Sequence, residues 1–244
     1  MNAWQKQQLP HWLSTGNGQR QFTADFFAAH INIISAQTSF LMIPVLAIEA
    51  IASHPDFKPL VSVDGINIDL RYASPNNFVG RDLYSPLDCA WLHQHSAAGL
   101  ERAVAWLKTE YPDYAFLVLD AVRPQRVQEM LWASLQGTDL MMYLADPARG
   151  SIHSFGMALD ITIVDAGGKE LDMGTPFDDL SERSQPKFEV EMLAKNKITQ
   201  HQINHRTILR NAMKYGGFSG ISTEWWHFDY GNRNQVREKY TRIL

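Results

Sequence analysis

The chain has 244 residues, of which 45% are hydrophobic and 20% are charged, and its mean hydropathy is −0.25. These values are typical of a soluble globular protein with a buried core, and they exclude disordered, collagen-like and membrane-spanning classes. The formal net charge of −4 provides no overall attraction to nucleic acid or to an anionic membrane. Cys89 is the only cysteine, so a metal site has to use His, Asp or Glu ligands.

Residues 1–59 differ in composition from the rest of the chain and are predicted to form a partly helical N-terminal extension. The most apolar stretch, residues 40–52, is too short to span a membrane. No basic start followed by an apolar run and a cleavage site is visible in the first thirty residues. The sequence therefore predicts a cytoplasmic protein, with a periplasmic or exported location left open.

From residue 61 onward the sequence shows regular structural patterns. Residues 61–70 alternate apolar and polar side chains around Asp64-Gly65, which indicates two strands joined by a tight turn or one bulged strand. Apolar side chains then recur at helical spacing over residues 96–111, and residues 115–119 form a short apolar run typical of a buried strand. A second helix is expected over residues 124–135.

The second half of the chain adds two strands and one helix. Residues 158–164 are predicted to form a strand, residues 204–215 a helix that ends at Gly216-Gly217, and residues 225–230 the last strand. Helices and strands occur in runs, and at least one β segment turns at a glycine. The sequence therefore predicts an α+β fold with a mainly antiparallel central sheet flanked by helices.

Residues 151–160 contain the first group of side chains suited to chemistry. His153 and Asp160 flank Gly156 at the start of a predicted strand. Imidazole nitrogen and carboxylate oxygen are suitable ligands for Zn²⁺. A turn histidine and an acid at a strand end would give the same pattern, so this spacing alone leaves both interpretations open.

Two further segments carry charged side chains at strand ends. Glu224 precedes His227 by three residues, an offset that places side chains on opposite faces of a strand, so Glu224 has to lie in the preceding turn if both serve one site. The alternative is an aromatic core strand with a polar tip. Arg123 follows the buried strand and could stabilise a carboxylate or a developing oxyanion, or form an internal salt bridge with Asp120.

Taken in order, these segments resemble the motifs of the zinc D-alanyl-D-alanine dipeptidase family. The matching patterns are Asp120-Ala-Val-Arg123-Pro124, then Ser151-x-His153-x-x-Gly156-x-Ala158-x-Asp160, then Glu224-Trp-Trp-His227. Residues 69–80 and 173–184 are similar to two further family segments. The resemblance implies a single-zinc peptidase fold of the D-Ala-D-Ala metallopeptidase and hedgehog-like type, with the catalytic domain over residues 60–244.

The resemblance also implies which residues perform catalysis. His153, Asp160 and His227 would bind one Zn²⁺, Glu224 would act as the catalytic acid and base, and Arg123 would stabilise the transition state. Three protein ligands leave a fourth position for water, as catalytic zinc sites require. Fe²⁺, Co²⁺ or Mn²⁺ could occupy such a site, depending on supply.

For substrate binding, the resemblance implies that Tyr72 and Asp178, with Ser151 nearby, meet the free ammonium group of the substrate. A carboxylate at the closed end of a small pocket favours a dipeptide over a long peptide. The alternative role for Asp178 is a helix N-cap. Val122 departs from the family pattern, which usually has an aromatic residue before the arginine, and the Met-rich residues 140–144 are a candidate lid.

The predicted function is zinc-dependent hydrolysis of D-Ala-D-Ala to two D-alanines, in peptidoglycan precursor metabolism or recycling. A peptidoglycan D,D- or L,D-carboxypeptidase is the nearest alternative, and a non-catalytic zinc-bearing binding module is an alternative of another class. The expected partner is a small dipeptide, without nucleic acid or a membrane span, and the oligomeric state stays open. The pairs His93 with His95 and His201 with His205 lack a third ligand and are not expected to bind metal.

Overall fold

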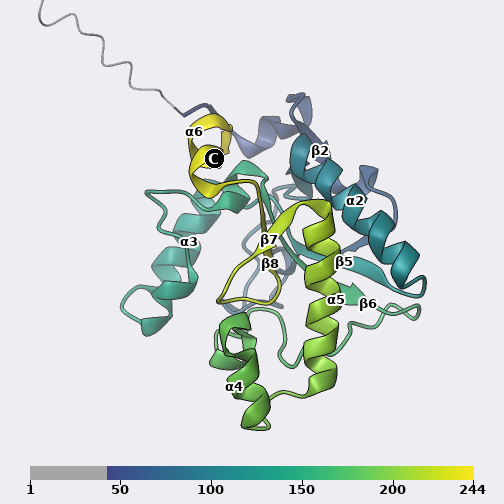
Figure 1. Cartoon of the computed structure of the whole chain (residues 1–244). Coiled ribbons are helices and arrows are strands. Elements are labelled where there is room, and N and C mark those ends of the chain that lie inside the picture. The colour runs from purple at the N-terminus through teal and green to yellow at the C-terminus, as the bar shows by residue number, and fades with distance from the viewer. Residues whose placement is uncertain (1–42) are drawn as a thin grey trace, which may run out of the picture. The chain divides into compact units, whose positions relative to one another are not determined.

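A five-stranded sheet lies at the centre of the computed structural model, which describes residues 43–244 (Figure 1). Most of the predicted N-terminal extension, residues 1–42, therefore lies outside the described residues. The strands of the sheet follow the order β3-β5-β6-β8-β7. Their bounds are Ile66–Ile68 for β3, Ala115–Asp120 for β5, Ala158–Val164 for β6, Phe218–Gly220 for β7 and His227–Tyr230 for β8. All seven residues of the middle strand, β6, are buried.

Within residues 43–244, two smaller sheets and five α-helices accompany the central sheet. β1 (Val45–Leu46) pairs in parallel with β9 (Arg242–Ile243), and β2 (Phe57–Pro59) pairs antiparallel with β4 (Trp91–His93). The α-helices are α2 (Gln94–Glu110), α3 (Gln125–Leu135), α4 (Glu189–Ala194), α5 (Gln200–Gly216) and α6 (Arg233–Lys239). Short 3-10 helices cover Ile48–Ser53, Leu60–Ser62, Arg71–Ala73, Asp139–Tyr143, Ile152–Phe155, Glu182–Ser184 and Pro186–Phe188. Among these described helices, none combines the length and the apolar character needed to cross a membrane.

The central sheet is mixed, whereas the sequence predicted a mainly antiparallel one. β5, β6, β8 and β7 pair antiparallel, but β3 pairs in parallel with β5. Both predicted forms of residues 61–70, a hairpin around Asp64-Gly65 and one bulged strand, are wrong, because residues 60–62 form a 3-10 helix and only residues 66–68 form a strand. The chain leaves β3, passes through α2 and returns as β5. A long crossover of this kind joins parallel strands.

The other predicted elements are present, β6 with the predicted bounds and the others with shifted ends. α2 begins earlier than predicted because the His93 side chain accepts a hydrogen bond at its N-terminus, and α5 begins earlier because Thr199 starts a capping box. Gly217, with φ of +94°, ends α5 as predicted. The strand predicted from Trp225 begins at His227, and it is not the last strand, because β9 follows α6.

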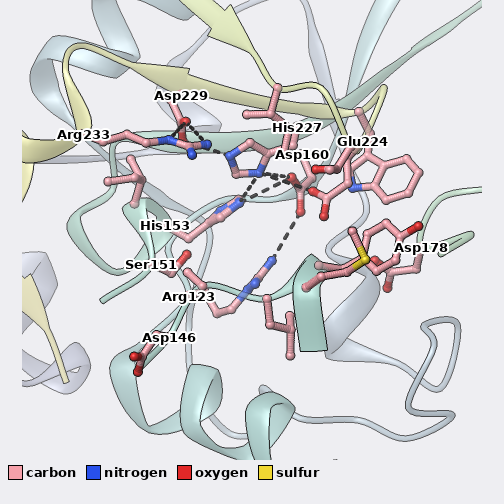
Figure 2. A pocket seen from close by; sticks show the side chains of 18 of the residues that line it. Arg123, Asp146, Ser151, His153, Asp160, Asp178, Glu224, His227, Asp229 and Arg233 are labelled. Carbon is pink, nitrogen blue, oxygen red and sulfur yellow. Dashed lines mark hydrogen bonds and ion pairs between the residues drawn. The ribbon is translucent and has the colours of Figure 1, made fainter. Parts of the chain in front are cut away.

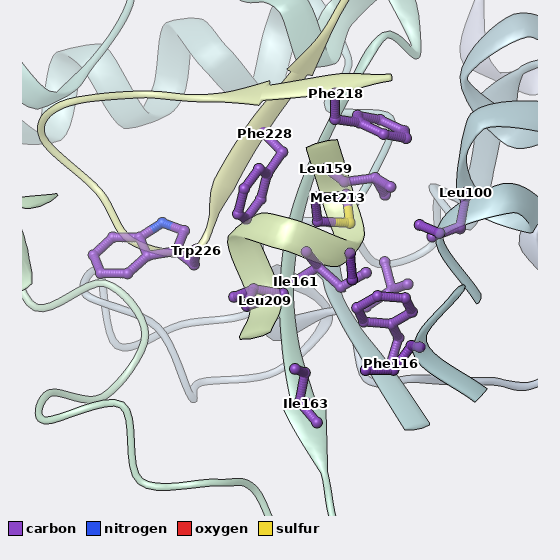
Figure 3. Packing of buried hydrophobic residues seen from close by; sticks show 14 of the residues in the cluster. Leu100, Phe116, Leu159, Ile161, Ile163, Leu209, Met213, Phe218, Trp226 and Phe228 are labelled. Carbon is purple, nitrogen blue, oxygen red and sulfur yellow. The ribbon is translucent and has the colours of Figure 1, made fainter. Parts of the chain in front are cut away.

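Successive side chains along each strand point to opposite faces of the sheet, and one of these faces is apolar. Leu159, Ile161 and Ile163 of β6 point into a core that α2 and α5 cover. Figure 3 shows these side chains with Leu100 of α2, Leu209 and Met213 of α5, and Phe116, Phe218, Trp226 and Phe228 from the sheet and its loops. Burial of these side chains is the main favourable contribution to folding.

The opposite face of the sheet carries charged side chains. Asp160 lies between Leu159 and Ile161 in β6 and therefore points away from the apolar core. His227 precedes the core residue Phe228 in β8 and points the same way as Asp160, its direct cross-strand partner. The alternation that buries the core thus also places two polar side chains next to each other on one face.

A β-bulge adds a third side chain to this row. The pairing of β5 with β6 shifts by one residue between Val118 and Asp120. Without that shift, Asp120 would point into the same core as Val118, because the two positions are two residues apart. With the shift, Asp120 pairs directly with Asp160, which pairs with His227. Three neighbouring strands therefore present one charged side chain each to the same region.

Two glycines allow α2 and α5 to lie close together. A Cβ atom on Gly99 of α2 would lie 2.9 Å from the carbonyl oxygen of Gly216 in α5 and 2.6 Å from the ring of Tyr230. A Cβ atom on Gly216 would lie 2.5 Å from the carbonyl oxygen of Gly99. Because backbone atoms cannot move aside as a flexible side chain can, the two helices require glycine at both positions.

We expect Gly99→Ala to lower the free energy of unfolding by about 1–3 kcal/mol, as overpacking of a close-packed layer does. Urea denaturation followed by circular dichroism measures the change. Gly167→Ala is the matched control, because an added Cβ there meets only the Asp165 side chain, at 3.3 Å. Equal stability of the two variants would contradict the requirement for close helix packing.

Candidate active site

The loop before β6 brings His153 back to the charged row of the sheet. His153 lies in the 3-10 helix Ile152–Phe155, which ends at Gly156 with φ of +64°. A Cβ atom on Gly156 would lie 2.7 Å from the backbone nitrogen of His93. Only glycine combines this left-handed conformation with so close a neighbour. The turn at Gly156 therefore returns the chain into β6, so that His153 faces Asp160.

Three side chains converge at this point (Figure 2). His153 Nε2 lies 3.2 Å from His227 Nδ1 and 3.3 Å from Asp160 Oδ1, and His227 Nδ1 lies 3.0 Å from Asp160 Oδ1. All three residues are buried. Among residues 43–244, this is the group of His, Cys, Asp or Glu side chains placed to hold a metal ion.

In each imidazole, the ring nitrogen that points away from the centre of the triad (the outer nitrogen) forms a hydrogen bond with an acceptor. His153 Nδ1 lies 2.8 Å from the carbonyl oxygen of Ala121, and His227 Nε2 lies 2.9 Å from Asp229 Oδ1. Because a carbonyl and a carboxylate only accept hydrogen bonds, each outer nitrogen donates. In the neutral imidazoles, the inner nitrogens then carry lone pairs directed at each other and at a carboxylate oxygen. This donor set fits a divalent metal ion of the zinc type.

The charges around the triad favour a cation at its centre. Burial acts to lower the pKa of His227, but Asp229 and Asp160 raise it to about 10. Burial likewise opposes ionisation of Asp160, yet His153 and His227 hold its pKa well below the usual value. The acidic neighbours thus stabilise positive charge, which a proton or a metal ion can supply.

Arg123 lies beside the triad and is held by two carboxylates. Its Nε and one terminal nitrogen donate to Asp120 Oδ2 at 2.9 and 2.7 Å, and the same terminal nitrogen donates to Asp160 Oδ2 at 3.3 Å. The other terminal nitrogen donates to Gln128 Oε1 at 3.1 Å. The salt bridge with Asp120 that the sequence left as an alternative therefore forms, and it fixes the guanidinium next to Asp160.

Glu224 lies in the loop before β8, where the three-residue offset from His227 requires it to be. Its Oε2 is 3.9 Å from His227 Nδ1. Burial raises the pKa of Glu224 to about 7, with His227 opposing the rise and Asp160 adding to it. A carboxyl group with this pKa can both accept and donate a proton near neutral pH.

Tyr72 and Asp178 meet at another part of the same cavity. The Tyr72 hydroxyl donates to Asp178 Oδ1 at 3.2 Å, and the backbone N–H of Phe78 lies 3.5 Å from Asp178 Oδ2. Asp178 has φ of 60° and caps none of the described helices, so the N-cap alternative is wrong. Burial raises the pKa of Asp178 well above its usual value, and Asp160 adds to the rise. A cationic group beside this carboxyl would stabilise its ionised form.

One cavity of about 240 Å³ contains all eight residues that the sequence singled out. They are Tyr72, Arg123, Ser151, His153, Asp160, Asp178, Glu224 and His227. Met142, Tyr143 and Leu144 of the Met-rich segment also line the cavity. The Tyr143 hydroxyl accepts a hydrogen bond from the Gln185 side chain. A role of this segment as a lid stays a prediction.

Several residues that support the site were not predicted from the sequence. Asp229 holds the outer nitrogen of His227 and is itself held by Arg233 (Figure 2). Asp229 follows His227 by two residues, so strand alternation could have identified it. Gln128, in contrast, reaches Arg123 from α3, and the sequence contains no signal for this long-range contact.

Other residues discussed from the sequence lie away from the cavity. Val122 is buried in a separate apolar cluster with Ile48, Ile51, Phe57 and Ile243 and does not line the cavity. His93 caps α2. The rings of His201 and His205 are 4.1 Å apart, and His205 Nδ1 lies 2.8 Å from the carbonyl oxygen of Asp172.

Comparison with known sequences finds close relatives of one kind. The Peptidase_M15 family model, described as D-ala-D-ala dipeptidase, matches residues 56–243. A D-alanyl-D-alanine dipeptidase of Escherichia coli (strain K12) is 35% identical over 164 residues, covering 67% of this chain and 78% of the relative. A protein of the same name from Synechocystis sp. is 30% identical and covers 55% of this chain and 66% of the relative.

Among solved structures, that of the LdcB LD-carboxypeptidase is similar to this chain with a TM-score of 0.42 and 15% sequence identity. The match covers 75% of this chain and 72% of that chain. A likeness at this level carries no argument about the site.

We expect Asp229→Ala to weaken binding of a divalent metal ion by about 10- to 100-fold, because His227 loses the acceptor that orients its ring. Competition with a chromogenic chelator measures the affinity. Asp165→Ala is the control, since Asp165 only caps a turn at the far end of β6. Unchanged metal affinity in Asp229→Ala would show that the hydrogen bond to His227 does not support the metal site.

Proposed function

The chain belongs to the D-Ala-D-Ala dipeptidase family of peptidases, and we propose that it hydrolyses D-Ala-D-Ala to two D-alanines in the metabolism or recycling of peptidoglycan precursors. One observation carries this proposal. A metal-type triad, a buried carboxyl group with a pKa of about 7 and a fixed guanidinium line one cavity with Tyr72 and Asp178. This combination supplies the groups that hydrolysis of a small peptide requires.

The family depends on zinc in general, and the triad fits that ion. His153, Asp160 and His227 would hold one Zn²⁺ per chain. When bound, zinc supplies a Lewis acid that polarises a carbonyl group and lowers the pKa of water. Ala121 and Asp229 orient the two imidazoles so that their lone pairs face the ion.

In this proposal, Glu224 transfers the proton. Its carboxylate accepts a proton from the attacking water and then donates it to the leaving amine of the second D-alanine. Burial favours this role, because it brings the pKa of Glu224 to about 7. The 3.9 Å between Glu224 Oε2 and His227 Nδ1 places the carboxyl group beside the triad without making it a member.

Arg123 stabilises the negative charge that develops on the carbonyl oxygen. Its guanidinium is always ionised, lines the cavity and is fixed by Asp120 and Gln128 before the substrate binds. A charge that is already oriented requires no rearrangement in the transition state, which is where it contributes most.

Tyr72 and Asp178 set the choice of substrate, and Ser151 lines the same cavity on the side of His153 (Figure 2). Asp178 offers a carboxylate to a free ammonium group, and the Tyr72 hydroxyl orients that carboxylate. An acylated or longer peptide would present an uncharged amide at this position and leave the buried carboxylate without a cation. Asp178 would then have to stay ionised without a cation or take up a proton, and either loses the charge-assisted contact that the free dipeptide makes.

Release of free D-alanine by zinc-loaded protein tests this function. We expect hydrolysis of D-Ala-D-Ala, much slower hydrolysis of its N-acetylated form and of a stem pentapeptide, and a loss of at least about 100-fold in kcat for Glu224→Gln. Zinc content and thermal stability of Glu224→Gln should equal those of the unchanged protein. Glu191→Gln, which alters a surface pair with Lys195, is the control.

Each contrary outcome supports a particular alternative. Preference for the blocked or longer peptide would indicate a D,D- or L,D-carboxypeptidase. Absence of turnover with all three peptides, in a protein that retains zinc, would indicate a binding module. Loss of folding in Glu224→Gln would indicate that this carboxyl group has a structural role.

A separate prediction concerns the ammonium group. We expect Tyr72→Phe and Asp178→Asn to raise KM for D-Ala-D-Ala by about 10-fold or more, with smaller changes in kcat, because charge-assisted hydrogen bonds to the substrate are lost. Steady-state kinetics measures both constants. Asp179→Asn is the control, since the neighbouring carboxylate pairs with Arg183 and does not line the cavity. An unchanged KM would remove Tyr72 and Asp178 from the substrate site.

A further inference from the structure

Three arginines line a part of the cavity that the proposed mechanism does not use. Arg149 precedes the loop that carries His153, while Arg233 and Arg237 belong to α6. The same three side chains also line a second, more open cavity beside residues 219–222 and 231–234. The arginine cluster, defined as Arg149, Arg233 and Arg237, therefore lies where the catalytic cavity continues toward the surface.

Two of these arginines have no carboxylate partner among residues 43–244. Arg233 forms an ion pair with Asp229, whereas neither Arg149 nor Arg237 forms one within the described residues. Arg237 Nε donates to the carbonyl oxygen of Gly150 at 3.0 Å. One terminal nitrogen of Arg237, Nη1, is buried and has no acceptor in the described part of the chain.

The acidic groups nearby are already engaged. Asp229 accepts from both His227 and Arg233. Asp146 also lines the cavity, but its Oδ1 accepts from the backbone N–H of Ala148, and it lies within ion-pair distance of no described cation. The arginine cluster thus has an excess of positive charge beside the triad.

Repulsion between the positive charges of the three arginines also favours binding of an anion. Burial lowers the pKa of Arg237, and the nearby charges of Arg149 and Arg233 lower it further. Asp229 offsets only part of this repulsion, and an anion bound between the arginines would offset more of it. A buried N–H group without an acceptor adds a second unfavourable contribution that an anion would remove.

Arg233 of the cluster and Asp178 lie on different sides of the triad. In Figure 2, Asp178 lies on one side of His153 and Asp160, and Arg233 lies on the other. The cavity therefore has an acidic end and a basic end, with the candidate metal centre between them. A dipeptide with free termini has the same charge order, an ammonium group at one end and a carboxylate at the other.

We propose that Arg149 and Arg237 form an anion subsite that binds the C-terminal carboxylate of the dipeptide, with Arg233 positioned beside them by Asp229. The identity of the ligand rests on the proposed function. The subsite itself rests on the geometry of the arginine cluster. Recognition is then bipolar, because Asp178 selects a free amino terminus and the arginines select a free carboxyl terminus.

The test compares D-Ala-D-Ala with D-Ala-D-Ala amide, which lacks the C-terminal charge. We expect the unchanged protein to prefer the free acid by at least about 10-fold in kcat/KM, mainly through KM. In the double variant Arg149→Gln/Arg237→Gln, that preference should fall to about 1, while kcat/KM for the amide stays within about 3-fold. Lys239→Gln is the matched control, because it removes one positive charge from an exposed residue of α6 that lines neither cavity.

A preference for the free acid that is equally large in the double variant would overturn the carboxylate subsite. Calorimetric titration of the unchanged protein and both variants with inorganic phosphate gives a second measurement that needs no turnover. We expect the double variant to bind phosphate at least about 10-fold more weakly than the other two proteins, because binding at the metal is common to all three. If the unchanged protein cleaves neither peptide, the proposed function fails, and the phosphate titration alone decides whether the arginines bind an anion.

Discussion

The convergence of His153, Asp160 and His227 depends on how two strands are paired and on the turn that precedes one of them. Asp160 faces His227 across the pairing of β6 with β8, and the turn at Gly156 returns His153 to them. Because the same alternation buries Leu159 and Ile161, a register slip of one residue would move Asp160 into the core. The packing that stabilises the fold and the geometry that brings the ligands together are therefore one constraint.

Charge compensation determines which further side chains the site requires. Two imidazoles and one carboxylate at about 3 Å need a cation, and each member is held by another group: His153 by Ala121, His227 by Asp229, and Asp160 by Arg123. These supporting groups come from the segment after β5 and from β8, so the three side chains are oriented before any ligand binds. Orientation of this kind lets fixed charges act on a transition state without prior rearrangement.

The sequence could predict those features of the fold and the site that depend on short stretches of residues. Strand β6 has the predicted bounds, and the motif residues meet because they lie at the ends of neighbouring strands. The parallel pairing of β3 could not be predicted, since the alternation in residues 61–70 is equally typical of a hairpin and only the path through α2 decides between them. The bulge between Val118 and Asp120 could not be predicted either, because no residue in this segment marks an extra strand position.

The two ends of the cavity have different consequences for specificity. A carboxypeptidase substrate and a dipeptide both have a free C-terminal carboxylate, so the arginine cluster alone cannot separate these activities. In the proposed substrate site Asp178 would separate them, because an internal residue of a longer peptide presents an amide where the dipeptide presents an ammonium group. Burial increases this discrimination between a dipeptide and a longer peptide. It raises the pKa of Asp178, so that the ionised carboxylate depends on a cationic ligand. In the proposed mode of binding, the acidic end would therefore select peptide length, and the basic end would fix the orientation of the dipeptide across the triad.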